Sequence, residues 1–259
     1  MCTTTVLLTE LMKLKMLKII IPLAGPSELF TNAGYYYPKP LIELNGRIMI
    51  DWVLQNPSNI TGDHKFLFII KEDDTQKFHL DNTLRLLSSG SEVFKLKKIT
   101  KGGLCSTLMA IDAIHPDDSL LILNGDQVID IDFNKVNEYW IKEKVDAGII
   151  TFNSVHPRWS YARIENEEVV QTAEKNPISS NAIAGYYYFR KAGDYFEAAY
   201  QSIKNDVQLD GNFYISPVIN QYVLRNQKVK AFQIKSEQYH SFYSPQMLLE
   251  YERKLNLQL

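Results

Sequence analysis

The sequence predicts an α/β fold in which a largely parallel β-sheet is flanked by helices. Short apolar runs rich in β-formers alternate with segments of helical periodicity, as in right-handed βαβ units. The candidate strands are almost continuously hydrophobic, which is typical of strands covered on both faces. A length of 259 residues suits one large α/β domain better than two small ones.

The first half of the chain carries most of this alternation. The predicted strands, rich in Val, Ile, Leu and Phe, are residues 18–23, 65–71, 92–99, 119–124 and 146–152. The segments between them, whose apolar residues recur about every 3.6 positions as in an amphipathic helix, are 48–56, 75–89, 104–114 and 133–144.

The second half is richer in strands. Residues 159–175 predict two short strands around a polar turn at 165–167, and residues 182–189 predict a further strand. After these we expect two helices, a strand and a last helix, at about 190–204, 213–225, 228–234 and from Pro245 onward. Because no linker or repeat interrupts the pattern, we predict a single domain over residues 17–259.

Residues 1–16 are predicted to be a disordered extension outside this domain. Their apolar run is short and interrupted by Glu10, and the lysines follow it, which is unlike a signal peptide. A translation start at Met12 or Met16 would explain the extension, and a short amphipathic anchor is the functional alternative.

Composition excludes several classes of function. The net charge is −2 and no block of Lys and Arg stands out, so nucleic-acid binding has no electrostatic support. Cys2 and Cys105 are too few for a disulfide framework, which suits a reducing cytoplasm, where we expect the protein to reside. No apolar run approaches the roughly 20 residues that a membrane-spanning helix needs.

Two candidate phosphate contacts follow the first predicted strand. In an open α/β sheet, ligands bind beyond the carboxyl ends of the strands. Ala24 and Gly25 lie there and allow the backbone to approach a ligand closely, although a plain strand-to-helix turn would also explain one glycine. Lys39 lies between two prolines that keep the backbone extended, and a fixed ammonium is a natural partner for phosphate. Alone, it would be a solvated surface lysine.

A candidate metal ligand follows the strand at 119–124. Asp126 lies at the exit of this strand, where a carboxylate can hold Mg²⁺ against a nucleotide phosphate. Asp130 and Asp132 add a second acidic pair, which could equally be a turn and a helix N-cap.

In this order, the stretches resemble the sugar-1-phosphate nucleotidyltransferase family, the pyrophosphorylases that make nucleotide sugars. The resemblance begins near residue 17 and covers the rest of the chain. The family's opening strand, Gly-rich loop and PKPL are echoed by IIIPLAGPSELF and YPKPLIELNGRIMI. A closer subgroup is suggested by NGDQ, FNSVHPRWSYARI and AEKNPISSNAIAGYYYF.

The resemblance implies a Rossmann-like fold of the GT-A kind, with a mixed, mostly parallel sheet and a β-rich substrate half. It implies that a sugar 1-phosphate, or a similar phosphorylated polyol, attacks the α-phosphate of an NTP and releases pyrophosphate. Mg²⁺ or another divalent cation would assist, and a homo-oligomer would be compatible with the family. The product would serve nucleotide-sugar or surface-polysaccharide biosynthesis.

The resemblance also assigns roles to individual residues. The implied catalytic residues are Lys39, Asp126 and Lys175. Those implied to contact the nucleotide are Leu23, Ala24, Gly25, Gly103 and Asp126. Those implied to contact the sugar are Glu174, Lys175, Gly185 and Tyr161. Asp126 would bind the metal, with His240 as a weaker second ligand. Independently, a carboxylate beside an ammonium suits a polyol phosphate, although a surface ion pair would look the same.

The chain departs from the family's pattern in two places. The family's second loop glycine falls on Ser27, and its loop arginine, which stabilises the leaving pyrophosphate, falls on Leu29. Losing such a charge costs on the order of 10²–10³ in rate, by analogy with an oxyanion donor. The family's second metal carboxylate falls on His240, which suits Mg²⁺ poorly. Other cations that would compensate are Lys101, Arg158 and Arg163.

Three functions therefore remain open from the sequence. The first is a nucleotidyltransferase acting on a phosphorylated sugar. The second is a catalytically impaired homologue that binds a nucleotide or nucleotide sugar, which Leu29 favours. The third is a glycosyltransferase that uses Asp130-Ile131-Asp132 as its DxD metal motif.

Overall fold

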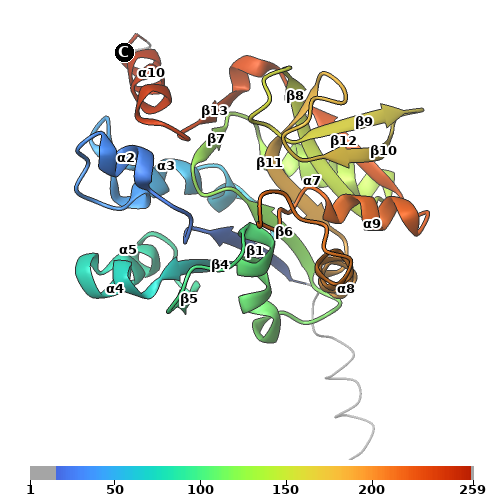
Figure 1. Cartoon of the computed structure of the whole chain (residues 1–259), viewed down its shortest axis with the longest axis horizontal. Helices are drawn as coiled ribbons and strands as arrows, with labels where there is room; N and C mark the ends of the chain where they lie inside the picture. The colour runs from blue at the N-terminus through green and yellow to red at the C-terminus, as the bar shows by residue number, and fades with distance from the viewer. Residues whose placement is uncertain (1–15, 258–259) are drawn as a thin grey trace, which may run out of the picture.

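The computed structural model describes residues 16–257, and a nine-stranded mixed sheet runs through them with helices on both faces (Figure 1). Most of the predicted N-terminal extension, residues 1–15, lies outside the described residues. The single domain expected over residues 17–259 stays a prediction.

Four parallel strands form the N-terminal half of the sheet, in the spatial order β6–β1–β4–β5. Their bounds are Leu17–Pro22 for β1, His64–Lys71 for β4, Glu92–Leu96 for β5 and Ser119–Leu123 for β6. These strands lie within one to three residues of the predicted ranges. Strands β1, β4 and β6 have buried runs of Ile, Leu and Phe because helices cover them from both sides, whereas β5 at the sheet edge is only partly buried.

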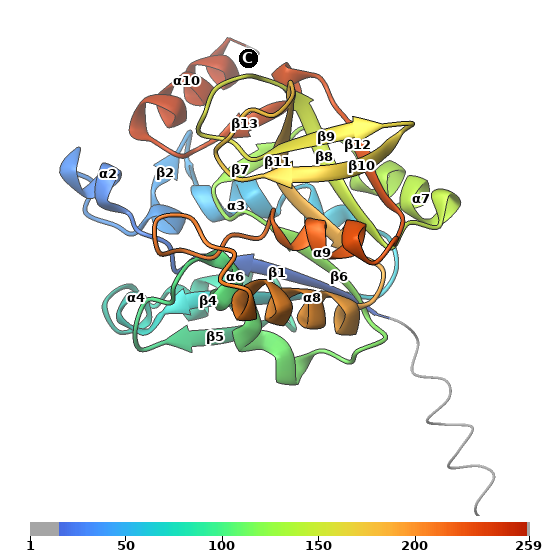
Figure 2. The ribbon, with the colours of Figure 1, turned by 45° about the vertical axis from the view of Figure 1, so that its right-hand side comes forward.

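The C-terminal half is mainly antiparallel and continues the same sheet through β11 (Asn181–Phe189), which pairs with β6, β8 and β9. Strand β12 pairs in parallel with β8. The other strands are β8 (Ala147–Asn153), β9 (Tyr161–Glu165), β10 (Glu168–Ala173) and β12 (Val229–Gln233). The hairpin β9–β10 projects from the edge of the sheet (Figure 2).

Two small antiparallel pairs lie apart from the main sheet. They join β2 (Glu43–Leu44) to β3 (Arg47–Ile48) and β7 (Gln127–Ile129) to β13 (Tyr239–Ser241).

Helices cover both faces of the sheet. Because successive residues of a strand point to opposite sides, neighbouring residues of β1 pack in different hydrophobic clusters. Ile20 packs in the cluster that contains side chains of α6 (Gly103–Thr107), α8 (Ala192–Lys204) and α9 (Val218–Leu224). Its neighbours Ile19 and Ile21 pack in the opposite cluster. The helices of that second cluster are α3 (Met49–Leu54), α5 (Leu80–Leu87) and α7 (Phe133–Glu143).

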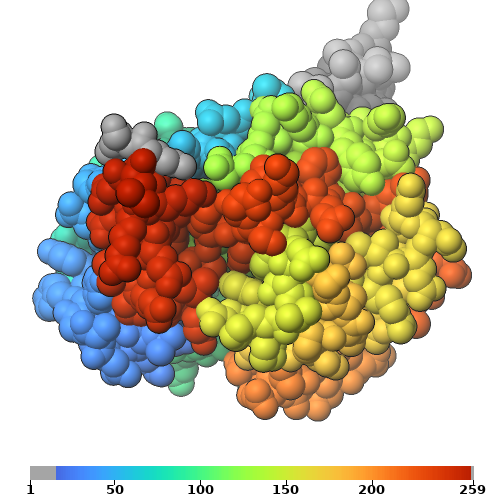
Figure 3. Space-filling view, turned by 90° about the horizontal axis from the view of Figure 1, so that it is seen from above, coloured from blue at the N-terminus to red at the C-terminus, as the bar shows by residue number. Residues whose placement is uncertain are grey.

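A third, smaller cluster joins the last helix to the first loops. Helix α10 (Pro245–Asn256) contributes Leu248, and the preceding Phe242 packs with Phe30 of the short helix α2 (Glu28–Asn32). Figure 3 shows the red C-terminal segment lying over the blue N-terminal residues. The C-terminus therefore supports the loop that leads to Lys39.

Three predicted helices differ from the structure. The helix expected at 104–114 is α-helical only to Thr107 and continues as a 3-10 helix to Ala113. The helix expected at 75–89 is divided into α4 (Glu72–Phe78) and α5 because His79 adopts a left-handed conformation, with φ of 52°. The helix expected at 213–225 begins only at Val218. Within residues 213–217, Tyr214 and Ile215 instead line the cleft described below.

No helix among the described residues is long and apolar enough to cross a membrane.

Candidate active site

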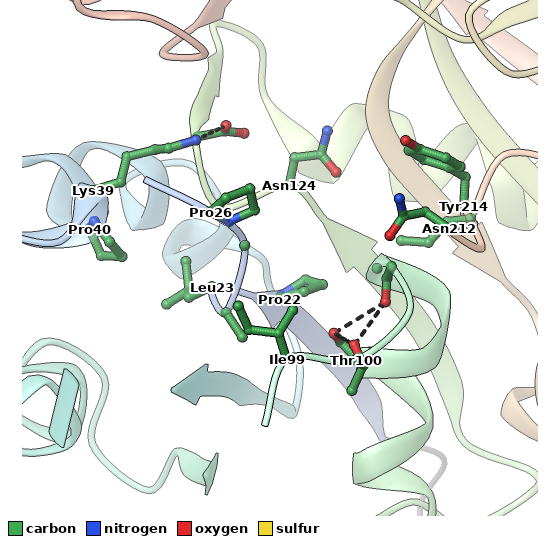
Figure 4. A pocket seen from close by; sticks show the side chains of 18 residues that line it. Pro22, Leu23, Pro26, Lys39, Pro40, Ile99, Thr100, Asn124, Asn212 and Tyr214 are labelled. Carbon is green, nitrogen blue, oxygen red and sulfur yellow. Dashed lines mark hydrogen bonds and ion pairs between the residues drawn. The ribbon is translucent and has the colours of Figure 1, made fainter. Parts of the chain in front are cut away.

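A cleft of about 350 Å³ opens beyond the carboxyl ends of β1 and β6, two neighbouring parallel strands (Figure 4). Strands β4 and β5 continue the sheet on the far side of β1, so the chain leaves β1 and β6 in opposite directions. This is the topological switch point at which α/β sheets bind ligands. The lining residues are Pro22–Pro26, Lys39, Pro40, Ile99, Thr100, Gly102, Gly103, Ser106, Asn124–Asp126, Asn212, Tyr214 and Ile215.

An ion pair lies on one side of the cleft. Lys39 Nζ donates to Asp126 Oδ2 at 2.8 Å, and both side chains are largely buried, with 18% and 27% of their surface exposed. Figure 4 shows Lys39 on the left of the cleft, with a dashed line from its ammonium to this carboxylate. Lys39 follows Pro38, whose extended backbone (ψ of 151°) directs the chain toward the cleft. The two predicted catalytic residues from the first half are thus in contact.

Close packing of two loops forms the base of the cleft. A Cβ atom at Gly125 would lie 2.1 Å from Leu23 Cδ2, so a larger residue there would have to displace the Leu23 side chain. A Cβ at Gly25 would meet nothing within 4 Å, because Gly25 faces the open cleft. Leu23, Ala24, Gly25 and Gly103 all line the cleft, and their contact with a nucleotide stays a prediction.

The opposite wall comes from residues 209–216. Asp210 and Gly211, with φ of 52° and 76°, form a tight turn between the bridge partners Leu209 and Asn212. Phe213 then pairs with the loop before α6, because its N–H donates to Lys101 O at 2.9 Å and its O accepts from Leu104 N–H at 3.1 Å. This pairing places Asn212 and Tyr214 on the right of the cleft in Figure 4.

Gly102 makes that pairing sterically feasible. Its φ is +96°, and a Cβ there would lie 2.4 Å from Phe213 O. Of the Gly102-Gly103 pair, Gly102 is therefore the residue that the backbone requires to be glycine.

Glu174 and Lys175 follow β10 and reach the same wall. Lys175 Nζ donates to Tyr214 OH at 2.9 Å. Glu174 Oε2 accepts hydrogen bonds from Ser160 Oγ at 2.5 Å and from Ser216 Oγ at 2.7 Å. The hydrogen bond to Tyr214 is the main reason why the pKa of Lys175 is raised, and the nearby charge of Glu174 adds to it. The pair itself does not line the cleft but is joined to it through Tyr214.

Tyr161 and Gly185 do not line the cleft. Tyr161 is completely buried (0% exposed), and its hydroxyl donates to His156 O at 2.6 Å, so it belongs to the core. Gly185, with φ of +59°, lies in an irregular stretch of β11, and a Cβ there would meet Asn124 Nδ2 at 2.3 Å. The expected sugar contacts at these two positions are therefore corrected: glycine at 185 makes room for Asn124.

His240 points away from the cleft. It lies 3.0 Å from Lys254 Nζ through Nε2 and packs on Tyr251, both of helix α10. Burial, aided by the charge of Lys254, lowers the pKa of His240 to about 4. Its neighbour Ser241 pairs with Gln127, and alternation along β13 turns His240 to the other face. The prediction of His240 as a metal ligand does not fit this geometry.

The donor set fits a divalent cation only in part. Asp126 supplies one carboxylate at the cleft, and the described residues contain no group of three or more His, Cys, Asp or Glu side chains arranged to hold a metal. Mg²⁺ commonly keeps several waters and binds through one or two carboxylates plus substrate phosphates. Asp126 could therefore hold Mg²⁺ together with the oxygens of a bound nucleotide.

Leu29 and the three candidate compensating cations do not line the cleft. Leu29 is 47% exposed on α2. Arg158 lies over Trp159 and donates to His156, and Arg163 lies 3.6 Å from Glu165 on the hairpin. Lys101 contributes a backbone carbonyl to the wall, and its side chain is exposed.

The acidic pair after Asp126 also lies outside the cleft. Asp132 caps α7 by accepting from Asn134 N–H at 2.9 Å, and Asp130 is exposed. The N-cap alternative therefore accounts for Asp132, and the DxD interpretation has no support from the geometry.

The sequence analysis missed the far wall of the cleft. Asn124, Asn212 and Tyr214 present amide and hydroxyl groups to the cleft, and Thr100 Oγ1 and Ser106 Oγ lie 2.7 Å apart beside Gly102. Asp210-Gly211 was the available signal, because Asp-Gly is a strong indication of a tight turn.

Comparison with known proteins agrees with this arrangement. Residues 34–239 match the family described as nucleotidyl transferase, which spans most of the chain. The chain belongs to the nucleotidyl transferase family. A search of curated protein sequences gave no match.

Solved structures of nucleotidyltransferases share the fold. A nucleoside-diphosphate-sugar pyrophosphorylase from Vibrio cholerae RC9 superposes with a TM-score of 0.80 at 24% identity, over 91% of this chain and 99% of that one. A UDP-glucose pyrophosphorylase solved with UDP-glucose gives 0.74 at 15% identity, over 94% and 100%. A putative glucose-1-phosphate thymidylyltransferase from Bacillus anthracis gives 0.67 at 18% identity, over 92% and 94%. The predicted α/β nucleotidyltransferase fold is confirmed.

Proposed function

We propose that this nucleotidyltransferase transfers a nucleotidyl group from an NTP to a sugar 1-phosphate or a similar phosphorylated polyol. One observation carries the proposal. Gly25, Lys39 and Asp126, far apart in the sequence, line one cleft, and Lys175 joins it through Tyr214. Neutralising and positioning crowded phosphates is the main work in such a reaction.

In the proposed reaction, an oxygen of the acceptor's phosphate attacks the α-phosphorus of the NTP. The bond from that phosphorus to the β-phosphate oxygen breaks, and its electron pair leaves with pyrophosphate. An ionised phosphate needs no general base to act as the nucleophile. Lys39 would hold phosphate oxygens, and the backbone at Ala24 and Gly25 would lie against the nucleotide.

A divalent cation, which the nucleotidyltransferase family generally uses, would neutralise charge on the triphosphate when bound. Asp126 is the residue of the cleft that would hold it. Beside the opposite wall, Lys175 would neutralise the acceptor's phosphate, and Glu174 would accept hydrogen bonds from the acceptor's hydroxyl groups. We expect the product to serve nucleotide-sugar or surface-polysaccharide biosynthesis.

The direct test is pyrophosphate release. Purified protein is mixed with Mg²⁺, each of the common NTPs and a panel of sugar 1-phosphates, and pyrophosphate is measured with a coupled assay. We expect one NTP and acceptor pair to stand out. Folded protein that turns over none of the pairs would contradict the proposal.

A binding protein without catalysis is the second candidate, and Leu29 favours it. No charge is present at the position from which the family's arginine acts on the leaving pyrophosphate, and Leu29 itself is exposed. This alternative predicts that NTPs or nucleotide sugars stabilise the fold against heat without any turnover.

The substitution Leu29→Arg tests whether the missing charge limits the reaction. Arginine is a good helix former and Leu29 is exposed on α2, so the fold should tolerate it. We expect pyrophosphate release to rise about tenfold or more, because a guanidinium near the cleft would stabilise the leaving group. Leu86→Arg, at an 87% exposed position of α5, is the matched control. Equal rates in both variants would show that the arginine position does not limit the reaction.

A further inference from the structure

The wall that carries Tyr214 and Ser216 holds both members of the Glu174-Lys175 pair. Tyr214 and Ser216 are two residues apart in a non-helical segment, and each hydrogen-bonds to one member of that pair. Tyr214 OH accepts from Lys175 Nζ at 2.9 Å, and Ser216 Oγ donates to Glu174 Oε2 at 2.7 Å. The two residues therefore fix the position of the pair beside the wall of the cleft.

The direction of the hydrogen bond at Tyr214 leaves a proton free. A lysine ammonium has three donors and no acceptor, so the Tyr214 oxygen must accept from it. The phenolic proton then points elsewhere, and no acceptor for it is found among residues 16–257. Tyr214 lines the cleft, on the wall opposite Lys39 and Asp126 (Figure 4).

This arrangement suits an anion with several oxygens. An O–H group that accepts from a cation is polarised and becomes a better donor. The ammonium also lies 4.9 Å from the centre of the Tyr214 ring, which holds the two groups together. Lys175 keeps two further N–H groups, so the ammonium and the phenol together offer three donors to one tetrahedral anion.

We propose that Tyr214 contacts the acceptor directly, by donating its phenolic proton to the phosphomonoester group that Lys175 neutralises. The inference deepens the proposed function and rests on it. It adds a residue that determines acceptor affinity, from a segment outside the Glu174-Lys175 turn. It also orients the reaction, because the acceptor's phosphate would approach from the wall opposite Lys39.

Tyr214→Phe tests the proposal because it keeps the ring and its packing and removes only the hydroxyl. We expect KM for the acceptor to rise about tenfold or more, since hydrogen bonds to charged groups are among the stronger ones. KM for the NTP should stay within about twofold. Tyr200→Phe, at a 66% exposed position of α8, is the matched control and should change neither constant. Unchanged acceptor KM in Tyr214→Phe, or an equal rise in both KM values, would overturn the proposal.

A second measurement does not depend on turnover. The ammonium signal of Lys175, assigned by its loss in Lys175→Arg, is followed by NMR while inorganic phosphate is added. We expect phosphate to shift this signal in the wild type, and the half-saturating concentration to rise about tenfold in Tyr214→Phe. A signal that phosphate does not move, or moves equally in both proteins, overturns the inference. Failure of every NTP and acceptor pair to react would instead overturn the proposed function alone.

Discussion

The ion pair between Lys39 and Asp126 should affect the binding of both a nucleotide and a divalent cation. In the ligand-free protein their charges cancel, so the Lys39 side of the cleft offers little net attraction to a triphosphate. A nucleotide and a divalent cation would separate the pair, one taking Lys39 and the other Asp126. Nucleotide and metal should therefore bind cooperatively, each relieving the cost that the other would meet alone.

Asp126→Asn tests this coupling at a single residue. Removing the carboxylate frees Lys39 and removes a repulsive charge, so the affinity for metal-free NTP should rise about tenfold. Turnover with Mg²⁺ should fall at the same time. Isothermal titration calorimetry in EDTA measures the first effect. Asp130→Asn removes the same charge outside the cleft and is the control. Weaker metal-free binding in Asp126→Asn would refute the coupling.

The positions of several cleft residues could be predicted from the sequence, and those of others could not. Leu23, Ala24, Gly25 and Asp126 directly follow strands, and the carboxyl end of a parallel strand is a local property of the sequence. The extended backbone expected on both sides of Lys39 is found only at Pro38, because Lys39–Leu41 form a short 3-10 helix that begins with Lys39 and Pro40.

The residues that were misplaced depend on distant contacts. The core position of Tyr161 follows from its bond to His156 O and from the pairing of its strand. Gly185 has a positive φ because β11 changes register against β8 between Ile183 and Tyr187, which no local pattern signals. The face on which His240 lies follows from the register of β13 against β7.

At the scale of elements, the helix predicted at 213–225 is the most informative error, because its first five residues are not helical. Residues 213–217 have buried Phe213 and Ile215 at a spacing of two, and Pro217 disfavours helix in the residue before it. These features indicate extended chain. However, Ile215 also fits the helical spacing of the apolar residues of α9, so the sequence pattern predicted one helix that began too early. What fixes the segment is its pairing with the loop before α6, a contact between distant parts of the chain.

Gly102→Ala tests that pairing. A Cβ at Gly102 would lie 2.4 Å from Phe213 O, so the wall must move away from α6. We expect a loss of about 1–3 kcal/mol in the free energy of unfolding, and weaker ligand binding. Gly34→Ala is the control, because Gly34 has a similar φ of +87° with nothing within 4 Å. Chemical denaturation compares the two. Equal losses would mean that backbone strain alone is responsible.

The contact between β13 and α10 should make stability depend on pH. The pKa of His240 is about 4 in the fold, below the ordinary value of 6.5, because burial and Lys254 disfavour the charged ring. Between these two values the unfolded chain binds the proton and the folded protein does not. The contribution of neutral His240 to the free energy of unfolding is therefore fully present above about pH 6.5. It is lost as the pH falls toward about 4.

His240→Gln measures this contribution. Glutamine can still accept from Lys254 but does not titrate, so the variant should lose less stability than the wild type between pH 7 and pH 5. Urea unfolding at both pH values gives the difference. His64→Gln, on β4, removes a histidine elsewhere. If the wild type and His240→Gln lose the same stability on acidification, the buried histidine plays no part.

At the scale of the whole molecule, the cleft joins the two halves of the chain. Ala24, Gly25 and Lys39 come from the N-terminal half, whereas Asn212 and Tyr214 come from the C-terminal half. The general α/β architecture was predictable because strand alternation is local. The convergence of these walls was not, because it depends on how β11 joins the parallel strands to the antiparallel ones.

A bound nucleotide should therefore stabilise both halves together. At a ligand concentration of about 100 Kd the gain is about 2.7 kcal/mol, which corresponds to roughly 5–10 °C in Tm for a protein of this size. Hydrogen exchange with Mg²⁺ and the preferred NTP should show slower exchange in residues 22–26 and also in 209–217. Protection confined to one half would contradict a shared cleft.

The third hydrophobic cluster has a consequence for mutational scanning. Phe242 and Leu248 pack with Phe30, whose ring lies 5.8 Å from the ammonium of Lys39. Neither Phe242 nor Leu248 borders the cleft. In a library of variants scored by turnover, substitutions at both positions should nevertheless lower activity. Residues as far along the chain as the final helix would then score like residues of the active site.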